Sequence, residues 1–222
     1  MTRHQGLGAR GTIFRMKTQT LHVYWSAAGL RPQSPDAAQT ARSAAAAKTL
    51  LTLPEASAPF AQNFRWGKIQ FSVETANLPG HNKVRITPSG LSVNNQPLER
   101  QIAGQLLSGE VADINRDGSP ELYLFVRSGD AVPRTQLLAF SVNRGKSLSD
   151  VHLAPLNGRP DLTRGYRGWD QFAVVESALV QRFPVFADQA ADTEPSAVRQ
   201  IRFRLSRGEA SWQLLAGPAE EF

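Results

Sequence analysis

From residue 64 onward, apolar and polar side chains alternate over short stretches separated by glycine, proline and asparagine. Residues 68–74 (KIQFSVE) alternate over their whole length, which is typical of a strand with one buried face. Similar stretches predict further strands at residues 83–87, 91–93, 98–102, 136–142, 148–153, 170–175, 179–186, 201–205 and 212–215. Consecutive strands are expected to pair antiparallel. Roughly nine or ten strands without an amphipathic helix predict an all-β fold, an antiparallel β-sandwich with a β-barrel as the alternative.

The remaining segments of this region are connections and one central hairpin. Residues 155–166 contain Gly158, Pro160 and Gly165 and are expected to form a loop or a single helical turn. Residues 187–197 are polar and acidic and are expected to form a long connection. Residues 111–126 combine a strand, a carboxylate-rich turn and a strand rich in apolar and aromatic residues, which predicts a β-hairpin.

The turn of that hairpin has the pattern D-x-N-x-D-G-x-x-E. Its oxygen-bearing side chains are those of Asp113, Asn115, Asp117 and Glu121. Side chains two positions apart in a tight loop can converge, and Gly118 allows a positive φ, so the spacing is typical of a calcium-binding loop. An EF-hand is excluded because Leu124 stands where its bidentate glutamate is required. Two interpretations stay open: a Ca²⁺ site between strands, and an Asx turn whose side chains accept backbone N–H groups without an ion.

The positive charge of the chain is concentrated at its N-terminus. The first 50 residues hold seven Arg or Lys against Asp36 alone, which accounts for the whole formal net charge of +6. Because these cations are dispersed through a segment that looks unfolded or removable, nucleic-acid binding is disfavoured. Cysteine is absent, which excludes a disulfide framework, a thiolate nucleophile and a cysteine-based zinc site.

Residues 1–63 are expected to form a leader that is separate from a domain at residues 64–222. The leader is rich in Ala, Ser, Thr and Gln, and its apolar tract at residues 43–53 is interrupted by Lys48. An A-x-A triplet follows at residues 56–58, although Pro59 is a poor neighbour for a cleaved bond. We expect either an atypical export signal or a disordered tail. A periplasmic or secreted protein is therefore expected, with a cytoplasmic one left open, and no apolar run has the ~18 residues of a transmembrane helix.

The sequence does not predict an enzyme. His152 is the one histidine placed in a predicted strand, where a half-buried or surface position is expected rather than a catalytic base. No Ser/His/Asp motif is present. Asp113 and Glu121 are the best pair for glycoside chemistry, but carboxylates grouped in such a turn more often serve structure.

An ordered set of motifs resembles the PliI family, the periplasmic inhibitors of I-type (invertebrate) lysozyme. The motifs are the turn at residues 113–122, RSG at 127–129, GYRGWDQF at 165–172 and LVQRFPVF at 179–186, and the likeness spans about residues 66–216. The resemblance implies a small exported β-sandwich that blocks a lysozyme by inserting an exposed loop into its active-site cleft. The implied partner is an I-type lysozyme or another protein or glycan of the bacterial envelope, and a homodimer is left open.

The resemblance also assigns a partner-binding loop. In the family this loop follows the strand after the turn and contains Ser-Gly-x-x-Tyr, whose hydroxyls meet the catalytic carboxylates of the lysozyme. Ser128 and Gly129 match its start, but no tyrosine follows. Asp130 would repel a carboxylate-lined cleft and Arg134 would attract one, so inhibition is expected to be weak or altered. The alternative is an ordinary hairpin turn.

A second candidate surface consists of Tyr166, Arg167 and Trp169. Two aromatic residues and a cation among glycines suit a recognition surface, including sugar stacking on the tryptophan. The alternative is that the cluster packs over the end of the sandwich. Two functional classes follow: a protein-binding envelope module related to lysozyme inhibitors, and a calcium-stabilised carbohydrate-binding or structural module.

Overall fold

The computed structural model describes residues 2–4, 11–15, 20–24, 58–156, 158–187, 194–209 and 211–222. The chain forms two compact units, residues 1–39 and residues 40–222. In the first unit, β1 (Thr2–His4), β2 (Gly11–Arg15) and β3 (Thr20–Tyr24) form an antiparallel sheet in that order. An atypical export signal or a disordered tail was expected for residues 1–63, and both stay predictions. The leader is basic overall, but it contains two short runs of β-forming residues, TIF and TLHVY.

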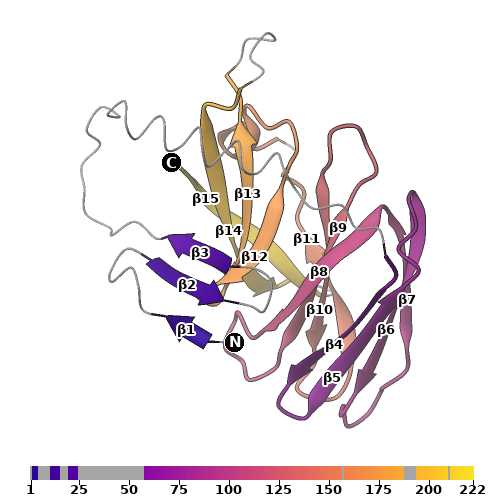
Figure 1. Cartoon of the computed structure of the whole chain (residues 1–222). Coiled ribbons are helices and arrows are strands. Elements are labelled where there is room, and N and C mark those ends of the chain that lie inside the picture. The colour runs from indigo at the N-terminus through magenta and orange to yellow at the C-terminus, as the bar shows by residue number, and fades with distance from the viewer. Residues whose placement is uncertain are drawn as a thin grey trace. The chain divides into compact units, whose positions relative to one another are not determined.

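The second unit contains two sheets (Figure 1). The smaller sheet has the antiparallel order β4 (Phe60–Trp66), β5 (Ile69–Thr75), β6 (His81–Ser89) and β7 (Leu98–Ala103). The larger sheet has the order β12 (Gln171–Val175), β13 (Ala178–Val185), β14 (Ala197–Arg207), β15 (Trp212–Glu221), β11 (Leu148–Leu153), β10 (Thr135–Val142), β9 (Glu121–Arg127) and β8 (Gln105–Ala112). The short helix α2 (Pro160–Thr163) follows β11. Among the described residues, no helix combines the length and apolarity that a membrane-spanning helix requires.

Strand β9 belongs to two hydrophobic cores at once. Its residues Leu122, Leu124 and Val126 pack with the four-stranded sheet, whereas Tyr123 and Phe125 pack with residues of β12 to β15. Because successive side chains of a strand point to opposite faces, one strand can serve both cores. The all-β prediction is confirmed, and the molecule combines the two expected alternatives: a sandwich on one face of β9 and a nearly closed, barrel-like sheet on the other.

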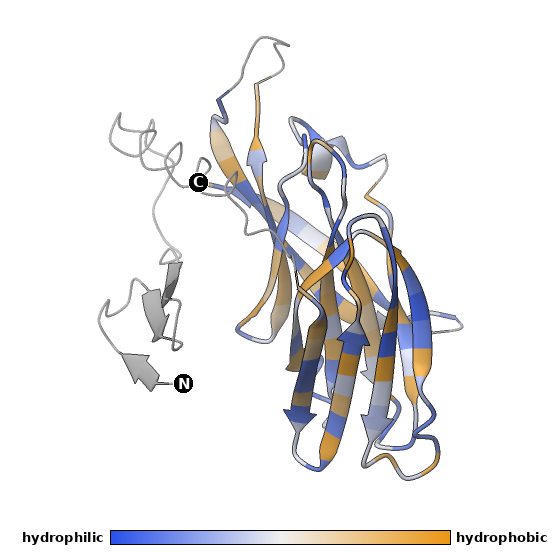
Figure 2. Cartoon of the chain, turned by 45° about the vertical axis from the view of Figure 1, so that its right-hand side comes forward, coloured by the Kyte–Doolittle hydropathy of each residue, from blue (hydrophilic) through white to orange (hydrophobic). Residues whose placement is uncertain are grey.

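The alternating pattern of the sequence is visible in the smaller sheet. In β5, the side chains of Ile69, Phe71 and Val73 are buried and those between them are more exposed, and β6 alternates in the same way. Figure 2 shows the alternation as bands of opposite colour along these strands. Burying each large apolar side chain contributes about 1.5–3 kcal/mol to the free energy of unfolding. The strand predicted at residues 68–74 is thus confirmed with a shift of one residue.

The start of the domain and one predicted strand differ from the sequence prediction. The structured domain begins with β4 at Phe60 rather than at Phe64; Phe60 pairs with Thr75 and is only 8% exposed. The strand β4 is largely polar between its aromatic residues, which is why it was assigned to the leader. No strand forms at residues 91–93, because the Asn95 side chain pairs with the backbone of Leu91, accepting from its N–H (2.9 Å) and donating to its carbonyl (2.7 Å).

Long-range pairing produced the other differences. The strands β11 and β15 are parallel, with Val151 opposite Trp212. At the edges of the larger sheet, β8 and β12 share no pairing register; instead, the Val174 N–H donates to the half-buried Glu110 carboxylate at 2.9 Å. Burial raises the pKa of Glu110, and this hydrogen bond lowers it. The Glu110 side chain therefore links β8 to β12. We call the line where these two edge strands meet the seam of the barrel-like sheet.

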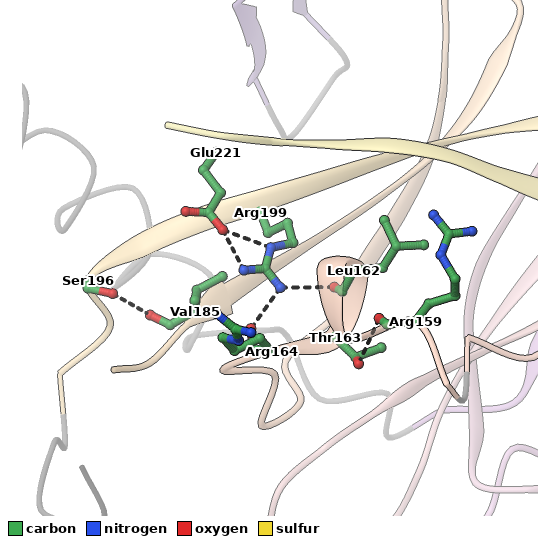
Figure 3. Close-up of polar contacts among 8 residues, drawn as sticks. All are labelled: Arg159, Leu162, Thr163, Arg164, Val185, Ser196, Arg199 and Glu221. Atoms are coloured by element: carbon green, nitrogen blue, oxygen red, sulfur yellow. Dashed lines mark hydrogen bonds and ion pairs between the residues drawn. The ribbon is translucent and has the colours of Figure 1, made fainter. Parts of the chain in front are cut away.

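The helix α2 is held by a buried arginine. The Arg199 guanidinium donates to the carbonyl oxygens of Leu162 (3.0 Å) and Arg164 (2.7 Å), and its Nε donates to Glu221 Oε1 at 2.9 Å. Figure 3 shows the guanidinium between Glu221 and the turn of α2. A buried cation requires such partners, so Arg199 fixes the start of the segment that leads to Tyr166.

Candidate functional site

The polar side chains of the β8–β9 turn bind the backbone of the turn itself. Asp113 accepts hydrogen bonds from the N–H groups of Asp117 (3.0 Å) and Gly118 (2.8 Å). Asn115 accepts from Asp117 N–H at 3.1 Å, and Asp117 accepts from Ser119 N–H at 2.8 Å. Gly118 has a φ of +83°, as the spacing required. This is the Asx-turn arrangement.

Glu121, the last residue of the pattern, is buried. Its carboxylate accepts hydrogen bonds from Ile114 N–H (3.0 Å) and from the Ser141 hydroxyl (3.3 Å). Its side chain is not exposed, and burial raises its pKa to about 7, with Asp113 and Asp117 adding to the rise and the Ile114 N–H opposing it.

The Tyr123 hydroxyl, on the same face of β9, is buried without a hydrogen-bond partner among the described residues. Burial and the charge of Glu121 raise its pKa. The carboxyl at the end of the turn therefore belongs to the interior of the protein.

No group of three or more His, Cys, Asp or Glu side chains is arranged to hold a metal ion in the part of the chain that the structure describes. The four oxygen-bearing residues are brought into one turn, but their oxygens already accept hydrogen bonds from backbone N–H groups. The geometry thus favours the Asx turn, and calcium binding stays a prediction.

The candidate partner-binding loop, residues 128–134, lies at the other end of β9. Ser128 N–H donates to the Arg134 carbonyl (2.8 Å), and Arg134 N–H donates to the Ser128 hydroxyl (3.0 Å), which closes the loop at its base. Ser128 is only 8% exposed, whereas Gly129, Asp130 and Arg134 are exposed. The serine that the resemblance assigns to partner contact therefore has its hydroxyl at the buried base of the loop, and the exposed tip carries Asp130.

The two candidate surfaces lie together. Trp169 N–H donates to the Pro133 carbonyl at 2.7 Å, and a Cβ on Gly168 would lie 2.7 Å from Val132 Cγ1. The loop at residues 128–134 and the segment at residues 166–169 are therefore in direct contact. We use the name end surface for six accessible residues of these segments: Gly129, Asp130, Arg134, Tyr166, Arg167 and Trp169.

The buried Asp170 connects the end of the loop at residues 128–134 to the segment at residues 166–169. It is 1% exposed, and its carboxylate accepts from the Tyr166 hydroxyl (2.7 Å), Gln181 Nε2 (2.8 Å) and Thr135 N–H (3.1 Å). Burial raises the pKa of Asp170 and these three donors lower it. The sequence analysis did not single out Asp170. The feature that could have indicated it is an acidic residue directly after the aromatic cluster that ends at Trp169.

The aromatic residues of the end surface are both packed and accessible. Tyr166 contacts Phe183 edge to face with ring centroids 4.8 Å apart, and the Arg167 guanidinium lies 4.8 Å from the centroid of the Phe186 ring. The Trp169 ring lies 6.1 Å from that of Phe186. Since Tyr166, Arg167 and Trp169 remain partly exposed, the two interpretations given for them are compatible.

Comparison of the chain with protein-family models, curated proteins and solved structures gives no match. The resemblance to the lysozyme inhibitors therefore rests on the sequence motifs alone.

Proposed function

We propose that residues 58–222 form an exported, non-catalytic binding module that uses the end surface to contact a protein of the bacterial envelope or its surroundings, with an I-type lysozyme as the first partner to test. The observation that carries the proposal is that hydrogen bonds, including those of Asp170, hold the loop at residues 128–134 and the segment at residues 166–169 together. A surface that is already ordered loses less conformational entropy on binding.

The charges of the end surface decide how strong that contact can be. Arg134 and Arg167 can approach a carboxylate-lined cleft, whereas the exposed Asp130 must be desolvated against it. No tyrosine hydroxyl is present in the loop to offset that penalty. We expect weak inhibition, in the micromolar range or weaker.

The test is a pull-down on immobilised I-type lysozyme together with a lysozyme activity assay. Asp130→Asn should strengthen binding and Arg134→Glu should weaken it by about tenfold, because the first removes and the second adds a like charge. Lys146→Glu changes the charge of an exposed residue outside the end surface and serves as the control. Nanomolar inhibition that is indifferent to both loop variants would overturn the proposal.

A second candidate function is glycan binding, favoured by the partly exposed Trp169 beside Arg167. Stacking of a sugar on the indole would shift the tryptophan fluorescence during titration with peptidoglycan fragments or chitin oligosaccharides. Trp169→Ala should abolish that shift, and calorimetry should show the loss of glycan binding in the same variant. If the lysozyme pull-down fails and glycan binding persists in Arg134→Glu, this second function is the correct one.

A further inference from the structure

A groove of about 830 Å³ lies on the barrel side of the second unit, and none of the residues that line it belongs to the end surface. Its walls come from the β8–β9 turn, from the β12–β13 turn and from β14 and β15. The apolar part of the lining includes Ala178 and Pro218, and the basic part consists of Arg159, Arg202 and Arg204. Concave sites that combine an apolar wall with a few charged groups are the usual form of small-molecule sites.

One of these three arginines already has a counter-charge. Arg159 forms a two-point ion pair with Asp161, with Nη2 2.7 Å from Oδ2 and Nε 3.0 Å from Oδ1. Figure 3 shows the Arg159 side chain extending away from Arg199, so it takes no part in the buried network around α2. The pair is neutral as a whole and contributes little net charge to the groove.

Arg202 and Arg204 are different. Neither has an ion pair or a hydrogen bond from its side chain among the described residues, and the acid in the lining, Asp161, is engaged by Arg159. Both residues belong to β14, two positions apart, so their side chains leave the same face of the strand. Two guanidinium groups on one face can approach the same anionic group together.

The neighbouring strand shows the same excess of positive charge. Arg182 of β13 lies diagonally across from Arg202, since Val180 is the residue opposite Arg202 and Gln200 is the residue opposite Arg182. Burial and then the charge of Arg202 lower the pKa of Arg182, with Glu220 acting in the opposite sense. Like charges held this close repel one another, and a bound anion would relieve that repulsion.

We propose that this groove binds a small amphipathic organic anion, whose carboxylate or phosphate lies between Arg202 and Arg204 and whose apolar body lies along Ala178 of β13 and Pro218 of β15, the strands on either side of β14. The two arginines supply the charge recognition, and the apolar wall excludes water from the body of the ligand. This site is independent of the partner contact proposed for the end surface.

The test uses the full chain and monomeric probes, titrated by calorimetry and by NMR chemical-shift mapping. Octanoate and octyl phosphate are the anionic probes, octanol has the same apolar body without the charge, and inorganic phosphate has the charge without the body. We expect saturable binding of octanoate or octyl phosphate, with at least about tenfold weaker binding of octanol and of inorganic phosphate. The relative affinities of the two anionic probes identify the preferred head group.

The decisive variant is Arg202→Gln/Arg204→Gln, which should weaken binding of the anionic probe by about tenfold or more and leave octanol binding unchanged. The matched control is Lys68→Gln/Arg144→Gln, which removes the same charge from exposed residues outside the groove lining and should bind as the unchanged protein does. A thermal melt of each variant confirms that it is folded.

Three results would overturn the proposal. They are the absence of saturable binding of either anionic probe, equal weakening in the control variant, and equal binding of octanol and octanoate. Co-sedimentation with phosphatidylglycerol vesicles but not with phosphatidylcholine vesicles, in a protein that does not bind free octanoate, would also overturn it, because the arginines would then serve a membrane surface.

Discussion

Asp113 and Glu121 stand at the two ends of one turn, and their surroundings give them opposite roles. Asp113 binds two N–H groups of the turn, whereas Glu121 is buried beside Tyr123 and Ser141. The sequence could group these carboxylates, because the D-x-N-x-D-G spacing is local. It could not predict that Glu121 is buried, because this burial depends on β10, which supplies Ser141.

The burial of Glu121 predicts how the free energy of unfolding depends on pH. Its folded pKa of about 7 lies above the ordinary value of 4.5, so the folded protein binds the proton more tightly than the unfolded chain does. The contribution of Glu121 to the free energy of unfolding is therefore lost as pH rises from about 4.5 to above 7, by about 3 kcal/mol in all. Glu121→Gln, which keeps an acceptor for Ile114 N–H, should remove this loss.

Urea unfolding at pH 5 and pH 8 measures the effect. The variant should gain stability relative to the unchanged protein at pH 8 and show little difference at pH 5. Asp130→Asn, a change of an exposed acid away from this turn, is the control and should leave the difference in stability between the two pH values as it is in the unchanged protein. An equal pH dependence of Glu121→Gln and the unchanged protein would show that Glu121 is ionised without penalty.

The turn also makes a prediction about calcium. If the Asx turn is the whole role of these residues, Asp113→Ala should lower the free energy of unfolding by about 1–2 kcal/mol, with or without millimolar Ca²⁺, because two backbone N–H groups lose their acceptor. If a Ca²⁺ ion binds, the ion should stabilise the unchanged protein by about 2.7 kcal/mol at 100 times its dissociation constant, and Asp117→Ala should abolish that gain. Thermal unfolding with Ca²⁺ and with a chelator separates the two outcomes.

At the scale of elements, the sequence predicted strands wherever the pattern was local. The alternation in β5 and β6 and the apolar runs in β9 and β13 were sufficient to predict these strands. In each of them, the order of apolar and polar residues matches the order of buried and exposed positions. It did not predict the parallel pairing of β11 with β15, which joins segments far apart in the chain. The absence of a strand at residues 91–93 depends on one side chain, Asn95, and periodicity does not report such contacts.

The seam between β8 and β12 gives the prediction at this scale. Glu110→Ala removes the acceptor of the Val174 N–H, so the edge strand β12 should open more often, whereas Glu110→Gln keeps an acceptor. We expect hydrogen exchange at the Val174 amide to be at least about tenfold faster in the alanine variant and nearly unchanged in the glutamine variant. Equal exchange in both would show that packing alone holds the seam.

At the scale of the molecule, the sandwich and the barrel-like sheet share β9, and the end surface is built on the barrel side of it. The sequence singled out Tyr166, Arg167 and Trp169 because two aromatic residues and a cation stand among glycines, and it singled out the loop with Arg134 through the resemblance to the lysozyme inhibitors. It did not find their contact with each other. That contact depends on Asp170 meeting Thr135 and Gln181, and on Arg199 fixing α2, both of which follow only from the sheet order.

The boundary of the second unit provides the last prediction. Residues 1–39 form a separate compact unit, and the Asn77 side chain donates to the Ala58 carbonyl at 3.3 Å, just before β4 begins. A chain that starts at Ala58 should therefore melt cooperatively within a few degrees of the full chain. A chain that starts at Arg65 loses Phe60, which is 8% exposed in the core, and Phe64, which packs against that core. Losing such aromatic contacts costs about 3–5 kcal/mol, which corresponds to a melting temperature lower by about 10 °C or more.

Calorimetry on the three chains checks this order. A chain from Ala58 that melts as poorly as the chain from Arg65 would mean that the preceding residues stabilise the sheets, because Phe60 and Phe64 are present in the first chain and missing from the second. A chain from Arg65 that melts like the full protein would mean that β4 is dispensable, and its place in the core would then contribute little stability. Equal melting of the full chain and the chain from Ala58, with a clear loss only from Arg65, places the start of the folded domain at β4.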